Sequence, residues 1–136
     1  MTLFPRINAP ILNETKAAVL AQEAKLADNF LSRGLGLMFR KTPKALILRF
    51  SKESRWGSSI HMAFMSFDLD LIWLSSSLKV MDIRERVKPF NLFKPATWRI
   101  YLPSVPARYV LELPVGTVTK SRTTVGDQLQ LIINNW

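Results

Sequence analysis

The stretch Ser59–Val80, SIHMAFMSFDLDLIWLSSSLKV, carries the strongest indication of the fold of this chain. It holds the most apolar run of the chain and its only histidine, His61, yet two carboxylates, Asp68 and Asp70, stand within that run. A carboxylate that leaves water needs a charged partner or hydrogen-bond donors to remain ionised. The stretch therefore predicts buried strands whose carboxylates are satisfied by an arginine or by backbone N–H groups from elsewhere in the chain.

Short apolar segments separated by turn residues lie within this stretch and on both sides of it. We expect one long or two short strands over Ile60–Leu74, a hairpin turn at Ser75–Ser77 and a returning strand over Leu78–Ile83. Further strands are predicted over Ala45–Phe50, Trp98–Leu102, Arg108–Leu113 and Gln128–Ile133. Loops are predicted over Ser51–Ser58, Arg84–Thr97 and Ser121–Asp127. Many short strands of this kind are typical of a mainly β protein, a compact sandwich or barrel.

The N-terminal region is less regular. Met1–Asn13 is expected to form an extended arm, followed by a single β-rich domain over residues 14–136. The propensities of Glu14–Phe30 favour a helix, although its apolar pattern also fits a strand. Asp28 is a suitable N-cap for a short helix over Asn29–Leu35, so one short helix is predicted near residues 28–35.

The composition excludes several kinds of chemistry. The chain has no cysteine and one histidine, which excludes disulfides, thiolate metal sites, cysteine nucleophiles and multi-histidine metal sites. No secretory signal and no apolar run of transmembrane length are recognised, and the lack of cysteine suits a reducing compartment, so a cytoplasmic protein is expected. The 19 basic and 10 acidic residues give a formal charge of +9, which favours attraction to polyanions.

Four pieces of the chain occur together in a recognisable order. They are Arg33 with Gly36–Arg40 (GLMFR), then His61–Asp70 (HMAFMSFDLD), Tyr109–Gly116 (YVLELPVG) and Val125–Asp127 (VGD). In this order and spacing they resemble the uncharacterised domain-of-unknown-function 192 family, over nearly the whole chain. The resemblance implies a β-rich sandwich with one short helix before the GLMFR motif, and no established activity.

The resemblance also implies details that differ from the propensities. It implies that Ala17–Lys25 is a strand, and we prefer this to a helix because propensity is a weak guide. The chain departs from the family pattern at His61, where bacterial members often have tryptophan, and at Asp68, which adds a second carboxylate beside Asp70.

Asp70 and Arg33 form the pair most suited to a functional or structural role. A carboxylate in an apolar strand suits the two-pronged donor of an arginine, either as a buried pair that fixes the fold or as part of a ligand pocket. No cofactor or metal site is predicted, since Asp68 and Asp70 alone provide too few oxygen ligands. The candidate residues for binding an unknown ligand or protein are Arg33, Arg40, His61, Asp68 and Asp70.

These residues support two different classes of function. The chain shows no Gly-x-Ser-x-Gly nucleophile motif, so we favour a small non-enzymatic binding domain. The alternative is an enzyme that uses Asp70 as a general base, which would require an open cleft beside that carboxylate.

Basic residues gather in two windows of the chain. Residues 33–55 hold seven basic residues and one acidic residue, and residues 79–108 hold seven and two. Aromatic residues such as Phe90 and Phe93 lie among the lysines and arginines of the second window, a combination that suits the binding of single-stranded nucleic acid or another polyanion. The candidate residues for this weaker binding are Arg84, Arg86, Lys88, Lys94, Trp98 and Arg99.

Overall fold

A computed structural model describes residues 6–7, 10–27, 45–54, 60–61, 68–88, 100–101 and 103–131 of the 136-residue chain. Side-chain surroundings are described for residues 10–24, 45–49, 68–88 and 103–131. In these regions the chain is mainly β, which confirms the predicted fold class. Within the described residues, no helix has the length and hydrophobicity needed to cross a bilayer.

The largest sheet has six strands in the order β1-β4-β5-β10-β7-β8. The strands are β1 (Arg6–Ile7), β4 (Ala24–Ala27), β5 (Leu46–Ser54), β7 (Leu69–Leu74), β8 (Val80–Val87) and β10 (Ala107–Pro114). Only the β4–β5 pair is parallel among them. This sheet ends at β1 and β8, so β8 is an edge strand.

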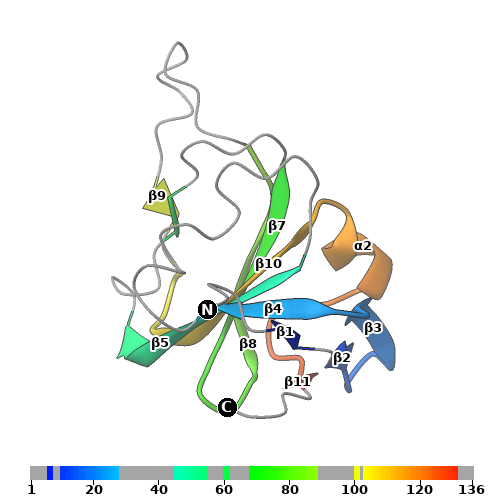
Figure 1. Cartoon of the computed structure of the whole chain (residues 1–136), viewed down its shortest axis with the longest axis horizontal. Helices are drawn as coiled ribbons and strands as arrows, with labels where there is room; N and C mark the ends of the chain where they lie inside the picture. The colour runs from blue at the N-terminus through cyan, green and yellow to red at the C-terminus, as the bar shows by residue number, and fades with distance from the viewer. Residues whose placement is uncertain are drawn as a thin grey trace.

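Two smaller sheets and a short helix complete the described structure. They comprise the sheet β11 (Leu129–Leu131)–β2 (Ile11–Asn13)–β3 (Ala18–Ala21), the pair β6 (Ile60–His61)–β9 (Ile100–Tyr101), and helix α2 (Thr117–Ser121). In Figure 1 the three-stranded sheet and α2 lie together at the right of the six-stranded sheet, and β9 lies at the left.

The six-stranded sheet is buried on both faces at its centre. On one face, Leu111 and Leu113 of β10 and Ile72 of β7 pack in a core that includes Ile11 and Leu129 of the small sheet. On the opposite face, Val110 is fully buried and pairs with the fully buried Trp73. Because β7 is enclosed on both sides, all six of its residues are buried, and every one except Asp70 is apolar.

The β7–β8 hairpin has the predicted position. The Leu78 backbone N–H donates to the Ser75 carbonyl (3.0 Å) and the Ser75 N–H donates to the Lys79 carbonyl (3.0 Å), which closes the turn at Ser75–Ser77. Strand β8 is longer than predicted. Arg84–Val87 continues the strand instead of beginning the predicted loop over Arg84–Thr97. The exposed charges there are typical of an edge strand. A shift in the pairing of β8 with β7 interrupts the alternation of buried and exposed side chains that would mark a strand in the sequence.

Other elements also differ from the predictions made by propensity. The helix favoured over Glu14–Phe30 is wrong for the described part, because Ala18–Ala21 and Ala24–Ala27 are strands β3 and β4. The family resemblance implied strand structure here, but as one strand over Ala17–Lys25, whereas β3 and β4 belong to different sheets. Strand pairing outweighs helix propensity there. The predicted loop over Ser51–Ser58 begins too early, since β5 continues to Ser54. The predicted helix over residues 28–35 lies outside the described residues.

In the N-terminal region, the described residues 6–7 and 11–13 form strands that take part in sheets. Strand β1 pairs with β4, and β2 lies between β3 and β11. The helix α2 was not predicted, because its sequence TVTKS contains three β-branched residues and has low helix propensity. Its stability depends on a carboxylate from another strand, described below.

Candidate functional site

Asp70 is fully buried near the start of β7, and its carboxylate receives three backbone N–H groups. Oδ1 accepts from the Arg86 N–H (3.1 Å), and Oδ2 accepts from Gly116 (3.1 Å) and Val118 (2.9 Å). Backbone N–H donors were one of the two kinds of partner predicted for this carboxylate, and that prediction is confirmed. Pairing with Arg33 stays a prediction, because Arg33 lies outside the described residues.

These hydrogen bonds join three elements around one carboxylate. Gly116 has φ +96° and is the N-cap residue of helix α2, which has no side-chain cap of its own, so Asp70 caps the helix from β7. Arg86 lies in β8, where Leu69 pairs with Val87 and Leu71 with Arg84, so two residues of β8 oppose Asp70 alone. This arrangement is a β-bulge, and the Asp70 carboxylate binds the backbone N–H of its second residue.

The geometry of Asp70 favours its structural role over a catalytic one. A general base must come within hydrogen-bond distance of the proton that it removes. Asp70 has no exposed surface, and the N–H groups that bind it belong to the protein backbone. The described contacts therefore give no support to Asp70 as a ligand-binding residue or as a base.

The other candidate ligand-binding residues are not brought together by the described structure. Arg40, like Arg33, lies outside the described residues, and His61 is described only by its backbone, which pairs with Ile100. Asp68 is partly exposed and immediately precedes β7.

A second buried carboxylate, Asp82, fixes the loop that leads into β10. Its Oδ2 accepts from the Ser104 N–H (2.8 Å), and its Oδ1 accepts from the Ile83 N–H (2.8 Å) and from Nη1 of Arg84 (3.0 Å). The same Arg84 nitrogen donates to the Ile83 carbonyl (3.2 Å). The guanidinium of Arg84, a predicted nucleic-acid contact, is thus held against its own strand.

A third carboxylate, Asp127, is the centre of a polar network between the two ends of the described chain. Its Oδ2 accepts from Asn13 Nδ2 (2.9 Å), Lys16 Nζ (2.8 Å) and the Thr124 N–H (3.0 Å). Through the last of these bonds Asp127 caps the turn in which Gly126 has φ +96°. Burial alone would raise the pKa of Asp127, but the hydrogen bonds from Lys16, Asn13 and Thr124 outweigh it and lower the pKa from 3.8 to about 2.

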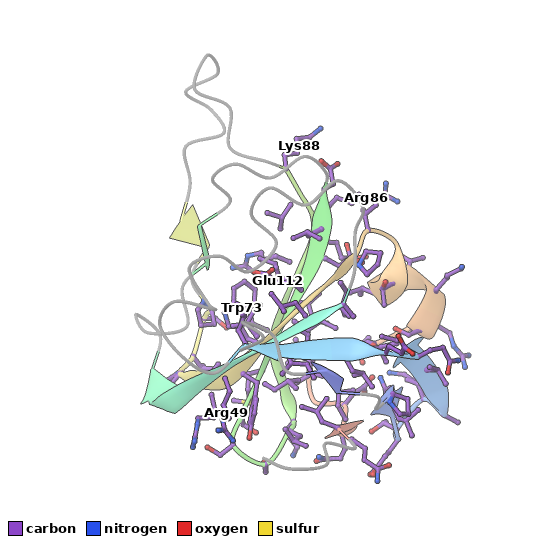
Figure 2. The ribbon with its side chains drawn as sticks, viewed as in Figure 1. Arg49, Trp73, Arg86, Lys88 and Glu112 are labelled. Carbon is purple, nitrogen blue, oxygen red and sulfur yellow. The ribbon has the colours of Figure 1, made fainter. Side chains whose placement is uncertain are left out.

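A fourth carboxylate, Glu112, lies in the middle of β10 and is also buried. It is on the same face of the sheet as Trp73, because Val110 pairs with Trp73 and Glu112 follows two residues later. Figure 2 shows Glu112 and Trp73 projecting from the central strands at the left of α2. This face is opposite the core that contains Leu111 and Leu113.

The described acidic and basic residues are distributed in opposite ways. Half of the eight acidic residues with described surroundings are buried, namely Asp70, Asp82, Glu112 and Asp127. None of the nine basic residues is buried; they are Lys16, Arg49, Lys79, Arg84, Arg86, Lys88, Arg108, Lys120 and Arg122. The charged side chains exposed on the described part of the surface are therefore mostly basic, and such a distribution attracts polyanions.

Four exposed basic residues define what we call the β8–α2 basic surface: Arg86, Lys88, Lys120 and Arg122. Asp70 joins β8 to α2 through their backbones, and the Thr119 hydroxyl donates to Oε1 of Glu85 (3.1 Å). Figure 2 shows Arg86 beside α2 and Lys88 beyond it at the end of β8. Within the described part of the chain, no ion-pair partner is recorded for these four side chains.

The sequence predicted only part of this surface. Arg86 and Lys88 were both candidates for polyanion binding, whereas Lys94, Trp98 and Arg99 lie outside the described residues. Lys120 and Arg122 were missed, because they lie beyond the second basic window. Helix α2, which contains Lys120 and has Arg122 as its C-cap, is joined to β8 by the carboxylate of Asp70, which binds the N–H groups of Gly116 and Val118 more than 40 residues later in the sequence.

Comparisons with known proteins identify relatives along almost the whole chain. The model of the DUF192 family, described as an uncharacterized ACR, matches residues 11–131. A UPF0127 protein of Pyrococcus furiosus is 39% identical over 120 residues, which cover 88% of this chain and 96% of the relative. A UPF0127 protein of Thermococcus gammatolerans is 43% identical over 119 residues, which cover 86% and 71%.

Two crystal structures have similar folds. One is of a Sinorhizobium meliloti 1021 protein named as a candidate transcription regulator, with a TM-score of 0.80 and 21% identity over 96% of this chain and 97% of that one. The other is of a Novosphingobium aromaticivorans protein of unknown function, with a TM-score of 0.75 and 20% identity over 91% and 84%. At these identities the likeness shows the fold alone. The family model and the sequence relatives together show that the chain belongs to the uncharacterised DUF192 family, which includes the UPF0127 proteins.

Proposed function

We propose that this protein is a non-enzymatic binding domain that binds polyanions, single-stranded nucleic acid in particular, through the β8–α2 basic surface. The observation that carries the proposal is the opposite placement of the charges. Four carboxylates are buried, three of them with backbone N–H donors, while every basic residue with described surroundings reaches the surface. Such a surface attracts phosphate chains and binds them largely through the release of counterions.

Nucleic acid is favoured over an acidic peptide by the chain that follows Lys88. That sequence carries Phe90 and Phe93, and aromatic side chains beside basic ones suit stacking of unpaired bases. The Sinorhizobium meliloti neighbour makes DNA a reasonable first probe, although a transcription regulator is only its name. We also propose a cytoplasmic location, which the absence of cysteine supports.

Salt dependence is the first test of this proposal. Four phosphate contacts on a single strand give a slope of log affinity against log salt of about −2.8, so affinity should fall about fiftyfold between 50 and 200 mM salt. Fluorescence anisotropy with a labelled 20-nucleotide oligo-dT measures this slope. Lack of binding at 50 mM salt would refute the proposal. Binding of polyglutamate with equal affinity would identify the partner as an acidic polymer instead.

Two single substitutions test whether binding depends on the β8–α2 basic surface or only on the net charge of the protein. Lys88→Gln removes one charge just after the end of β8 that carries Arg86, and Lys79→Gln removes one charge just before the other end of the strand. We expect Lys88→Gln to reduce the salt slope by about 0.7 to 1, and Lys79→Gln to leave it close to that of the wild type. Equal reductions would mean that the overall charge, rather than this surface, attracts the polymer.

A further inference from the structure

Arg86 has a backbone conformation that is unusual for its residue type. Its φ is +55°, in the left-handed region, which glycine adopts at little cost and which side chains with a Cβ disfavour. Residues held in such conformations are often found where a function requires them. The conformation is maintained by the hydrogen bond from the Arg86 N–H to the buried carboxylate of Asp70 (3.1 Å).

The bulge at Arg86 determines which side chains face outward. If β8 paired regularly beyond Arg84, Arg86 would lie opposite Leu69, which is fully buried. The extra residue instead brings Val87 opposite Leu69, where it is buried, and leaves Arg86 exposed. A glycine would produce the same bulge with less strain, so the backbone alone does not account for an arginine at this position.

We propose that Arg86 determines the affinity of the β8–α2 basic surface, and that its guanidinium makes a two-pronged contact with the phosphate groups of a single-stranded nucleic acid. This inference rests on the proposed function. Asp70 positions Arg86 through the backbone, and the arginine fork provides two parallel N–H donors that an ammonium group cannot offer in a fixed geometry. Lys88 then contributes a point charge next to that contact.

The test uses a substitution that separates binding from folding. Arg86→Gly removes the guanidinium and relieves the left-handed conformation, so we expect a melting temperature equal to or above that of the wild type. Affinity for labelled oligo-dT at 50 mM salt should fall about tenfold, as is appropriate for the loss of a phosphate contact. Arg86→Lys keeps the charge without the fork, and we expect it to lose about threefold in affinity.

Ala17→Gly is the matched control, because Ala17 is exposed, has φ +51° and carries no charge. It should leave the affinity unchanged. If the wild-type protein fails to bind oligo-dT, the proposed function itself fails. If the wild type binds and Arg86→Gly binds equally well, the role of Arg86 is refuted while the proposed function stands. Full affinity in Arg86→Lys would likewise refute the two-pronged contact.

Discussion

Replacement of Asp70 by alanine is expected to lower the free energy of unfolding by about 4 kcal/mol. The substitution removes a fully buried carboxylate and leaves the N–H groups of Arg86, Gly116 and Val118 without their acceptor. Each buried N–H that loses its acceptor costs about 1–3 kcal/mol, and partial entry of water reduces the total. Urea denaturation followed by tryptophan fluorescence measures the change.

Asp68→Ala is the matched control for this experiment. Asp68 is the same residue type, two positions earlier and partly exposed, so its loss should change the stability by no more than about 0.5 kcal/mol. A loss below about 1 kcal/mol for Asp70→Ala would contradict the role of this carboxylate in joining β7, β8 and α2.

Acid is expected to destabilise the protein through Asp127. Its pKa is about 2 in the folded protein and 3.8 in the unfolded reference, so the unfolded chain binds the proton more readily. The resulting stabilisation is fully present above about pH 4 and is lost as the pH falls through 2, a loss of about 2 kcal/mol. Asp127→Asn cannot titrate, so between pH 4 and 2 its stability should fall by about 2 kcal/mol less than that of the wild type.

The measurement is urea denaturation at several pH values between 5 and 2. Glu14→Gln is the control for the removal of one carboxylate, since Glu14 is exposed and close in sequence to Lys16. Parallel curves for Asp127→Asn and the wild type would show that the network of Asn13, Lys16 and Thr124 does not hold the Asp127 carboxylate in its ionised form.

Much of the β structure could be predicted from the chain itself. The largely apolar stretch Ile60–Leu74 indicated buried strand structure, of which Leu69–Leu74 is strand β7, and the serines after it indicated the hairpin turn, because both signals are local. Helix α2 gives a weak local signal and depends on Asp70, which is 46 residues before Gly116. A tertiary cap of this kind cannot be recognised from the helix sequence alone.

The candidate site could be predicted only in part, again because its contacts join residues that are far apart in the sequence. The sequence indicated that Asp70 would be buried and satisfied by an arginine, with Arg33 preferred, or by backbone N–H groups. It did not indicate which N–H groups, since the bulge that presents the Arg86 N–H appears only when β7 and β8 pair. The partners of Asp127 include Asn13, 114 residues away, in a region predicted to be an arm. Polar groups so far apart along the chain are brought together only by the pairing of the strands that carry or flank them.

The position of β2 has a consequence for the synthesis of the protein. Residues 11–13 pair with residues 129–131, so the three-stranded sheet cannot close until the later segment has left the ribosome. The β7–β8 hairpin needs only neighbouring residues and can form earlier in translation. Contacts over such a distance along the chain also slow folding. During that interval Ile11 lacks its neighbours from β11, so β2 can be bound by chaperones or can pair with another nascent chain.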